Sequence, residues 1–303
     1  MNALEMRGVV KSYDGKRNAV DGVTLDVPQG GVFGFLGPNG AGKTTTVMML
    51  SGLLAPSSGE LRVEGIDPVR QPERVHAISA LSTEHTRMYD HMTGSENLKF
   101  FGRLYGMSEC DIAARSAELL RELELDDARD RKLGAYSTGM RQRLSLARVL
   151  MHRPKVLFLD EPTSGLDPES VQSVNELISR QGREGATVFL CTHQLRYAQE
   201  ICTRYGLMSN GHLLSSGTFE QLEAQVGARR RVRLRCGGAQ PQGFERLGEG
   251  RYEADAQDDA QVARLIAQAV RGGTDIYEVT RVRDSLEDLY FALLKRHEGG
   301  GQG

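Results

Sequence analysis

The sequence lacks tryptophan altogether, and it contains no long hydrophobic run. Its longest apolar stretches, such as residues 47–54, fall far short of the roughly 20 residues that a membrane-spanning helix needs. The first residues include Glu5 and Arg7 and form no apolar signal region, so we expect no signal peptide. We therefore expect any role at a membrane to come through a partner protein.

Cysteine and net charge are also low. The four cysteines, at positions 110, 191, 202 and 236, form neither a C-x-x-C pair nor a metal-binding spacing, which favours buried thiols in a reducing cytosol over a disulfide framework. Lysine and arginine number 38 against 40 aspartate and glutamate residues, a net charge of −2. A general nucleic-acid binder normally carries a basic excess, so we expect no nucleic-acid partner.

Short apolar runs alternate with helical patterns over the first two-thirds of the chain, which is typical of an α/β protein with a mostly parallel sheet. Residues 32–36 predict a strand, and a helix follows from residue 43 to about residue 54. Residues 95–123 predict a helical insert in which Ser108 and Asp111 form a capping box. Strands are expected again at 156–159 and 187–191, and Asn210-Gly211 predicts a two-residue hairpin.

The composition changes near Val226, so we expect one domain over residues 1–225 and a small accessory domain over residues 226–303. Residues 227–235 are rich in arginine, and residues 237–241 predict a linker or loop. A small α+β appendage is then predicted, with a helix at 260–270 between strand-like segments at 251–254 and 276–279. Ser285 and Asp288 cap a final helix whose apolar stripe is expected to pack within its own domain, with a partner surface as the alternative. A flexible tail is expected at residues 299–303.

A phosphate-loop pattern, Gly37-x-x-x-x-Gly42-Lys43-Thr44, is complete. In such a loop the glycines let backbone N–H groups turn toward phosphate oxygens, and the following helix points its positive end at them. Lys43 would neutralise the β- and γ-phosphates, and Thr44 would offer its hydroxyl to Mg²⁺. The alternative is an ordinary glycine loop with an exposed lysine, but the predicted strand before and helix after favour the phosphate loop.

A second acidic element follows the strand at residues 156–159. Asp160 and Glu161 end that strand, and the carboxyl ends of parallel strands are where open α/β sheets bind ligands. We expect Asp160 to hold Mg²⁺ and Glu161 to polarise the water that attacks the γ-phosphate. A solvated acidic strand end is the alternative, and the phosphate loop makes the catalytic pair the better interpretation.

Three further segments resemble motifs of the ABC ATPase family. Residues 136–143 (Tyr-Ser-Thr-Gly-Met-Arg-Gln-Arg) resemble the family signature, with Tyr, Thr and Met in place of the commoner Leu, Gly and Gln. Residues 164–167 (Ser-Gly-Leu-Asp) resemble the D-loop of the family. Thr192-His193 resembles the segment that carries its switch histidine, and Tyr13 matches the aromatic residue on which adenine stacks. The resemblance covers residues 4 to 223.

The resemblance implies a P-loop NTPase (RecA-like) core with an antiparallel β subdomain, an α-helical signature subdomain at about residues 88–150 and the C-terminal α+β appendage. It implies ATP and Mg²⁺ as cofactors, with Glu161 and His193 in catalysis and Thr44, Asp160 and Glu84 at the metal. The residues it assigns to nucleotide contacts are Tyr13, Gly37, Pro38, Asn39, Gly40, Ala41, Gly42, Lys43, Thr44, Thr45, Ser137, Gly139 and Asp167.

The resemblance further implies a dimer. Ser137 and the Gly139 backbone begin a helix and would form a second anion site facing the γ-phosphate bound by the opposite subunit. The chain has one phosphate loop and one signature, so a second copy or a paralogue must supply the other half, and a homodimer is expected. His193 would report the γ-phosphate, with a structural histidine as the alternative. Tyr13 can equally pack on the surface, and Asp167 can also cap a helix.

One position departs from the family. Residues 78–93 contain no glutamine where the family has one, and the position falls at Thr83 or Glu84. Glu84 can approach Mg²⁺ or the attacking water, but it cannot donate an amide hydrogen bond. The sequences of residues 93–98 and 103–107 most resemble those of bacterial ATP-binding subunits from multidrug- and sodium-type exporters. This implies a membrane permease of about six helices and a location on the cytoplasmic face of the membrane.

Two rival functions remain at this point. A soluble ABC protein acting on ribosomes or DNA would normally carry two such domains or a long coiled coil, and neither is present. The arginines at residues 229–235 keep this alternative open, although one charged edge strand is more often simply solvated. A small-molecule kinase would use the same phosphate loop, but the signature and the Asp160-Glu161 pair argue against it. The transported cargo is not predicted.

Overall fold

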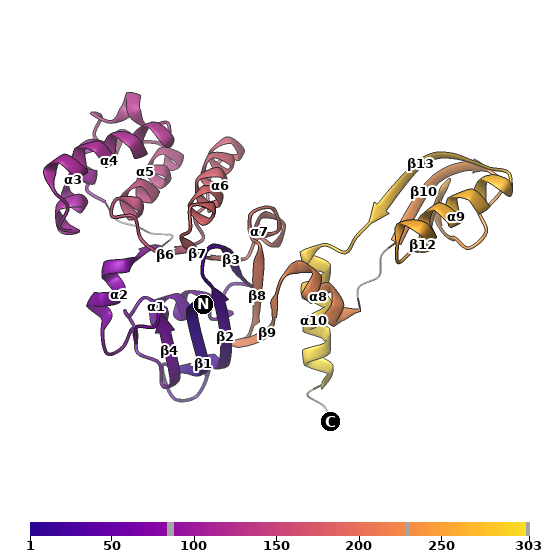
Figure 1. The fold of residues 1–303 in the computed structure, drawn as a ribbon, viewed down its shortest axis with the longest axis horizontal. Coiled ribbons are helices and arrows are strands. Elements are labelled where there is room, and N and C mark those ends of the chain that lie inside the picture. Colours follow the sequence, from indigo (N-terminus) through magenta and orange to yellow (C-terminus); the bar gives the residue numbers. More distant parts are fainter. Residues whose placement is uncertain (84–87, 228–230, 301–303) are drawn as a thin grey trace. The chain divides into compact units, whose positions relative to one another are not determined.

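The computed structural model describes residues 1–83, 88–227 and 231–300, which form two compact units (Figure 1). The first unit comprises Met1–Thr218 and the second Phe219–Gly303. The boundary therefore falls ahead of the expected position after residue 225. The physical reason is that α8 (Phe219–Val226) packs against α10 (Leu286–Gly300) of the second unit.

A six-stranded sheet with the order β5-β6-β7-β3-β8-β9 forms the centre of the first unit. Its first five strands run parallel, and the last pairs antiparallel with its neighbour through the predicted hairpin. Its strands are β3 (Gly31–Leu36), β5 (Ser79–Ser82), β6 (Val156–Asp160), β7 (Thr187–Thr192), β8 (Arg204–Ser209) and β9 (His212–Gly217). Every residue of β6 and β7 is buried, as expected for parallel strands covered on both faces.

An antiparallel sheet with the order β2-β1-β4 forms a second layer of this unit. Its strands are β1 (Asn2–Ser12), β2 (Asn18–Pro28) and β4 (Ser58–Val63). Helix α1 (Lys43–Leu50) contacts both β4 and β2 of this sheet and β6 of the central one. One hydrophobic core therefore joins the two sheets, and it holds the helix that follows the phosphate loop.

The remaining helices of the first unit include the predicted signature subdomain. They are α2 (Pro72–Ile78), α3 (Gly94–Leu104), α4 (Glu109–Glu122), α5 (Thr138–Leu150), α6 (Pro168–Arg183) and α7 (Leu195–Ile201). The predicted helical stretch at 95–123 consists of two helices, because the chain turns at Gly106 with a φ of 73°. Ser108 caps α4 as predicted, and Thr93 with Glu96 forms a complete capping box at the start of α3.

The second unit contains a four-stranded antiparallel sheet, β11-β12-β10-β13, with α9 against it. Its elements are β10 (Arg231–Gly238), β11 (Glu245–Gly248), β12 (Arg251–Asp255), α9 (Asp259–Arg271) and β13 (Thr274–Val282), besides α8 and α10. Ser285 caps α10 as predicted, and the apolar stripe of that helix faces α8. Helix α10 continues to Gly300 instead of ending before a tail at residue 299.

Two local predictions were wrong. Helix α1 ends at Leu50, not near residue 54, because Gly52 turns the chain with a φ of 75°. From Arg231 on, the arginine-rich segment is not an edge strand but part of β10, which lies between β12 and β13. Gly237 and Gly238 end this strand, so the predicted loop is confined to residues 239–241.

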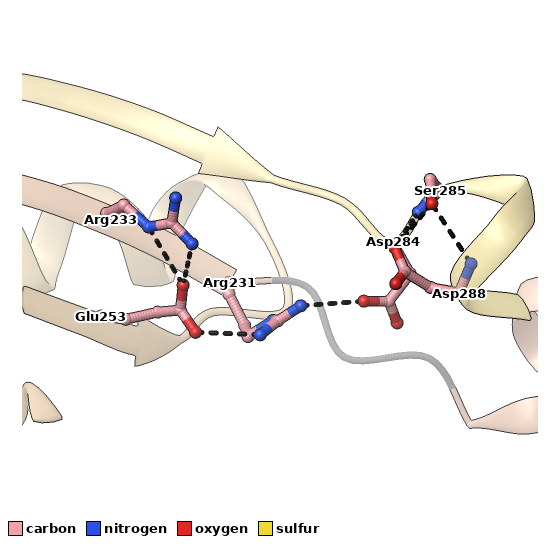
Figure 2. A network of polar contacts seen from close by, with 6 residues as sticks. All are labelled: Arg231, Arg233, Glu253, Asp284, Ser285 and Asp288. Carbon is pink, nitrogen blue, oxygen red and sulfur yellow. Dashed lines mark hydrogen bonds and ion pairs between the residues drawn. The ribbon is translucent and has the colours of Figure 1, made fainter. Parts of the chain in front are cut away.

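The arginines on β10 are held by carboxylates of the same unit (Figure 2). Arg231 bonds Glu253 and Asp284, each at 2.9 Å, and Arg233 bonds the other carboxylate oxygen of Glu253. Arg235 pairs with Glu278 at 3.2 Å. Burial alone would lower the pKa of Arg231, but the two carboxylates outweigh it and raise that pKa. The positive charges of Arg231, Arg233 and Arg235 are therefore compensated inside the unit.

Candidate nucleotide-binding site

The phosphate loop joins β3 to α1, and its backbone requires glycine at two positions. Gly42 has a φ of 102°, and a Cβ there would lie 2.3 Å from the carbonyl oxygen of Ala19. A Cβ on Gly37 would lie 2.3 Å from the carbonyl oxygen of Met208. Real Cβ atoms do not approach that closely, so the loop can adopt this tight path only without side chains at these positions.

Lys43 places its ammonium inside this loop. Its side chain is buried, and its Nζ donates to the carbonyl oxygens of Gly37 at 2.7 Å and Pro38 at 3.1 Å. The first turn of α1 contains no acidic residue that would screen the positive end of the helix dipole. The Lys43 ammonium and the positive end of α1 thus meet at one point, which is the arrangement that binds phosphate.

Thr44 and Asp160 bring two oxygen ligands together beside Lys43. The Thr44 hydroxyl donates to Oδ2 of Asp160 at 2.7 Å, although the two residues belong to different elements. Hydroxyl and carboxylate oxygens are ligands that Mg²⁺ prefers, so this donor set fits that ion. A cavity of about 320 Å³ opens beside them, lined by Ala19, Asn39, Gly40, Gly42, Lys43, Thr44, Thr45, Asp160 and Glu161.

Glu161 is held at the edge of the same cavity in a backbone conformation that is rare for this residue type, with a φ of 50°. Its Oε1 accepts a hydrogen bond from the backbone N–H of His193 at 2.9 Å and lies 2.7 Å from Nδ1 of that ring. Its Oε2 accepts from the Thr192 hydroxyl at 2.9 Å. The structure thus brings the predicted base and the predicted switch histidine into direct contact.

Cys191 precedes Thr192 in β7, and its thiol is buried. Burial, and to a smaller extent the charge of Asp160, raise the pKa of its thiol well above the usual value. The thiol therefore stays protonated at neutral pH. Three of the four cysteines are buried as expected, and Cys110 is exposed.

The signature residues begin α5. Ser137 is the N-cap, and its hydroxyl accepts from the backbone N–H of Met140 at 3.2 Å. A Cβ on Gly139 would lie 2.7 Å from the Ser170 hydroxyl and 3.5 Å from Oδ2 of Asp167, so the starts of α5 and α6 lie side by side. The lining of the cavity around Lys43 includes neither Ser137 nor Gly139.

Asp167 caps α6, which is one of the two roles predicted for it, the other being a nucleotide contact. Its carboxylate accepts from the backbone N–H of Ser170 at 3.0 Å and from the hydroxyl of the same residue at 2.9 Å. The backbone hydrogen bond, followed by the hydroxyl bond, lowers the pKa of Asp167. The cap fixes the D-loop residue beside the signature.

The remaining predicted residues differ in how far the structure places them at the cavity. Tyr13 is exposed, and its hydroxyl lies 3.3 Å from that of Thr45, so the ring lies beside the phosphate loop. Ala41 is buried and accepts from the backbone N–H of Gly211 at 3.1 Å, which makes it a structural residue of the loop. Glu84 lies outside the described residues.

Two residues with direct contacts to this site were missed by reasoning from the sequence. Thr192 was noted only as the neighbour of His193, although its hydroxyl bonds Glu161. Gln142 of α5 donates to the carbonyl oxygen of Pro162 at 2.8 Å and so ties the signature helix to the loop after Glu161. A hydroxyl residue directly after an apolar run was the available signal for Thr192. Gln142 lay within the signature segment, but nothing in the sequence indicated its own contact.

Comparison with known proteins agrees with this geometry. The family model described as "ABC transporter" matches residues 20–164. The chain is 37% identical to the daunorubicin/doxorubicin resistance ATP-binding protein DrrA of Streptomyces peucetius, over 96% of this chain and 92% of that protein. It is 40% identical to the ABC transporter ATP-binding protein NatA of Bacillus subtilis, over 67% of this chain and 83% of that protein.

Solved structures show the same fold. A structure of the ATP-binding subunit of an ABC transporter matches with a TM-score of 0.69 and 30% identity, over 74% of this chain and 93% of that one. A dimeric ATP-binding cassette bound to ADP and Pi matches with a TM-score of 0.65 and 23% identity, over 71% of this chain and 98% of that one. No helix within residues 1–83, 88–227 and 231–300 is both long enough and apolar enough to cross a bilayer. The chain belongs to the ATP-binding proteins of ABC transporters, in a branch with DrrA and NatA, and is the subunit that hydrolyses ATP to drive transport.

Proposed function

We propose that two copies of the chain close over two molecules of Mg·ATP and thereby drive a separate membrane permease that exports its cargo. The observation that carries this proposal is the meeting of Lys43, Thr44, Asp160 and Glu161 at one cavity, while the signature lies outside its lining. A site with a complete phosphate-binding half and no signature of its own needs a second polypeptide to cover the nucleotide.

Phosphate binding and water activation fall to different residues of this cavity. Lys43 and the backbone N–H groups of the loop would hold the β- and γ-phosphates, and Thr44 with Asp160 would hold Mg²⁺. The ion, when bound, neutralises charge on the phosphate oxygens. Glu161 orients the attacking water and accepts its proton. His193 reports the γ-phosphate by moving its ring from the Glu161 carboxylate to that group.

The second half of each site comes from the opposite subunit. Ser137 and the buried Gly139 begin α5, where the helix dipole and the N-terminal N–H groups favour an anion. Asp167 stands beside them as the cap of α6. Their adjacency supports a single surface that carries both the signature and the D-loop, as a two-fold dimer requires. Both halves of a site are present in this chain, which supports a homodimer.

A permease of about six helices would dock on the helical subdomain, which places the chain on the cytoplasmic face of a bacterial membrane. A groove of about 860 Å³ runs between α2, the end of α3 and α4, and His76, Leu104 and Arg115 are among its lining residues. Leu104 is exposed, and Phe100 and Tyr89 also expose apolar surface. A groove lined in part by an exposed leucine, on a subdomain that exposes further apolar side chains, fits a helical segment of a partner protein. Export follows the likeness to resistance proteins.

The soluble alternative loses its main support. Its case depended on the arginine-rich segment, and Arg231, Arg233 and Arg235 of that segment are paired with carboxylates of their own unit. A nucleic-acid site needs uncompensated positive charge along its surface. We therefore propose that no nucleic acid binds there.

Replacing Glu161 tests the catalytic part of this proposal. Glu161→Gln keeps the shape of the side chain but removes the base, so kcat should fall roughly 100-fold or more. ATP binding should persist, and ATP-bound dimers should accumulate because they no longer hydrolyse their nucleotide. Turnover is measured by phosphate release and the dimer by size-exclusion chromatography with ATP.

Glu176→Gln is the matched control, since it removes an exposed carboxylate from α6 without touching the cavity. It should leave both readouts unchanged. Wild-type turnover in Glu161→Gln would remove Glu161 from its proposed role. Co-purification of the chain with a membrane protein in detergent tests the permease separately.

A further inference from the structure

We infer that Thr192 is a positioning residue for ATP hydrolysis, which holds the Glu161 carboxylate through Oε2 while His193 moves. This inference rests on the proposed role of Glu161 as the base. Thr192 is completely buried at the end of β7, and its hydroxyl donates to Oε2 of Glu161 at 2.9 Å. Oε1 instead faces His193, so the two carboxylate oxygens are held by different residues.

The backbone of Thr192 is fixed from both sides. Strand β7 lies between β6 and β3, and Thr192 pairs in register with Leu36, the last residue of β3. Its carbonyl oxygen accepts from the N–H of Gly37, the first residue of the phosphate loop, at 3.4 Å. A buried β-branched side chain in a central strand has little rotational freedom. The hydroxyl is therefore a fixed reference point between the phosphate loop and Glu161.

The Thr192 hydroxyl has two hydrogen-bond partners. The backbone N–H of Gln194 donates to the Thr192 oxygen at 3.1 Å. That contact uses a lone pair of the oxygen, and the single hydroxyl proton is donated to Oε2 of Glu161. Hydrogen bonds from a hydroxyl to a carboxylate oxygen are among the stronger kinds.

The two residues that hold Glu161 differ in exposure. The His193 side chain is 45% exposed, whereas Thr192 is completely buried. When the His193 ring leaves for the γ-phosphate, Oε1 keeps the backbone N–H of His193 and gains a free lone pair toward the water. Oε2 keeps the Thr192 hydroxyl throughout. The carboxylate then has one oxygen anchored and one available, which is the geometry that a general base needs.

Three variants at this position test the inference in the full-length chain. Thr192→Val and Thr192→Ala remove the hydroxyl, the first with little change in volume, and Thr192→Ser keeps it. We expect the first two to lower kcat roughly ten- to a hundredfold, because a misplaced base loses this much. The affinity for a fluorescent ATP analogue should stay within about twofold of wild type, since no binding contact is lost. Thr192→Ser should restore kcat.

Thr187→Val is the matched control. Thr187 is also buried on β7, but its hydroxyl accepts from the N–H of Gly30 at the opposite end of the strand. This variant should lower thermal stability and leave kcat per folded molecule unchanged. The ATP-bound dimer should live longer in Thr192→Val and Thr192→Ala than in wild type, an effect that a damaged fold would not produce.

Wild-type turnover in either variant without the hydroxyl overturns the inference, as does an equal loss in Thr192→Ser. If Thr192→Val fails to fold, Thr192→Ala carries the test, because it removes the hydroxyl without adding a methyl group in its place. Glu161→Gln separates this inference from the proposed function. If Glu161→Gln is inactive while Thr192→Ala is fully active, only the role of Thr192 is contradicted. If Glu161→Gln is active, the role of Glu161 as the base is contradicted.

Discussion

The two units of the chain are stabilised in different ways. In the first unit, Phe189 contacts the rings of Phe33, Phe35 and Phe158 at centroid distances of 5.6, 5.0 and 6.1 Å, deep in the core. In the second unit the core is smaller, and the apolar residues of α9, such as Leu265 and Ile266, are only partly buried. There the ion-pair network around Arg231 joins β10, β12 and the turn that leads into α10.

This difference follows from what each unit has to hold. The site in the first unit depends on the ends of β3, β6 and β7 lying in fixed register, because Lys43, Asp160 and Thr192 belong to three separate segments. Close packing resists such displacements. A set of partly exposed ion pairs contributes less stability per contact and responds to salt. The second unit is therefore the part of the chain that we expect to tolerate change.

The largest effect should come from Phe189→Ala. Removing a fully buried aromatic ring from the centre of the sheet should cost about 3–5 kcal/mol of unfolding free energy, through lost burial and the cavity left behind. Hydrogen exchange read by mass spectrometry should show lost protection throughout the first unit. Protection lost mainly in the second unit would contradict the contrast between the two cores.

Arg231→Met should have an intermediate effect that is confined to the second unit. The substitution keeps much of the side-chain volume but removes the bonds to Glu253 and Asp284, and bonds to charged groups of this kind contribute about 1–3 kcal/mol. Loss of exchange protection at β10, β12 and the start of α10 would show it. Unchanged protection there would mean that the network does not stabilise the unit. ATP hydrolysis in the first unit should stay at the wild-type rate.

Arg235→Met should have the smallest effect. Arg235 has one carboxylate partner, Glu278, and both side chains are more than half exposed. Solvent and salt screen such a pair, so the loss should be below about 1 kcal/mol. Urea denaturation compared with Arg231→Met measures the difference. Equal losses in the two variants would show that burial does not decide the strength of these pairs.

The sequence predicted the first unit better than the second for a physical reason. Residues 156–159 and 188–191 are continuous apolar runs, the first directly before the acidic pair Asp160-Glu161, and such signals are local. The arginines of β10 alternate with Val232, Leu234 and Cys236, which is also a strand signal. Whether that strand lies at an edge or inside the sheet depends on partners such as Glu253 and Glu278, which come much later in the chain. Local patterns do not contain that information.

Prediction of the nucleotide-binding site from the sequence has the same limit. The phosphate loop and the acidic pair were predicted because backbone geometry and charge restrict which residues can stand there. The contact of Thr192 with Glu161 was not, because it joins the ends of two strands that are paired only in three dimensions. The adjacency of Gly139 and Asp167 likewise arises from the packing of α5 against α6.

Mixing two inactive variants tests the central claim most directly, namely that Lys43 of one copy and Ser137 of another enclose the same nucleotide. Lys43→Ala and Ser137→Arg should each abolish hydrolysis alone. In an equal mixture, half of the dimers contain both variants, and each of these has one intact composite site. Activity should therefore return to roughly a quarter of wild type if the two sites work independently. A mixture no more active than its separate components would contradict the account.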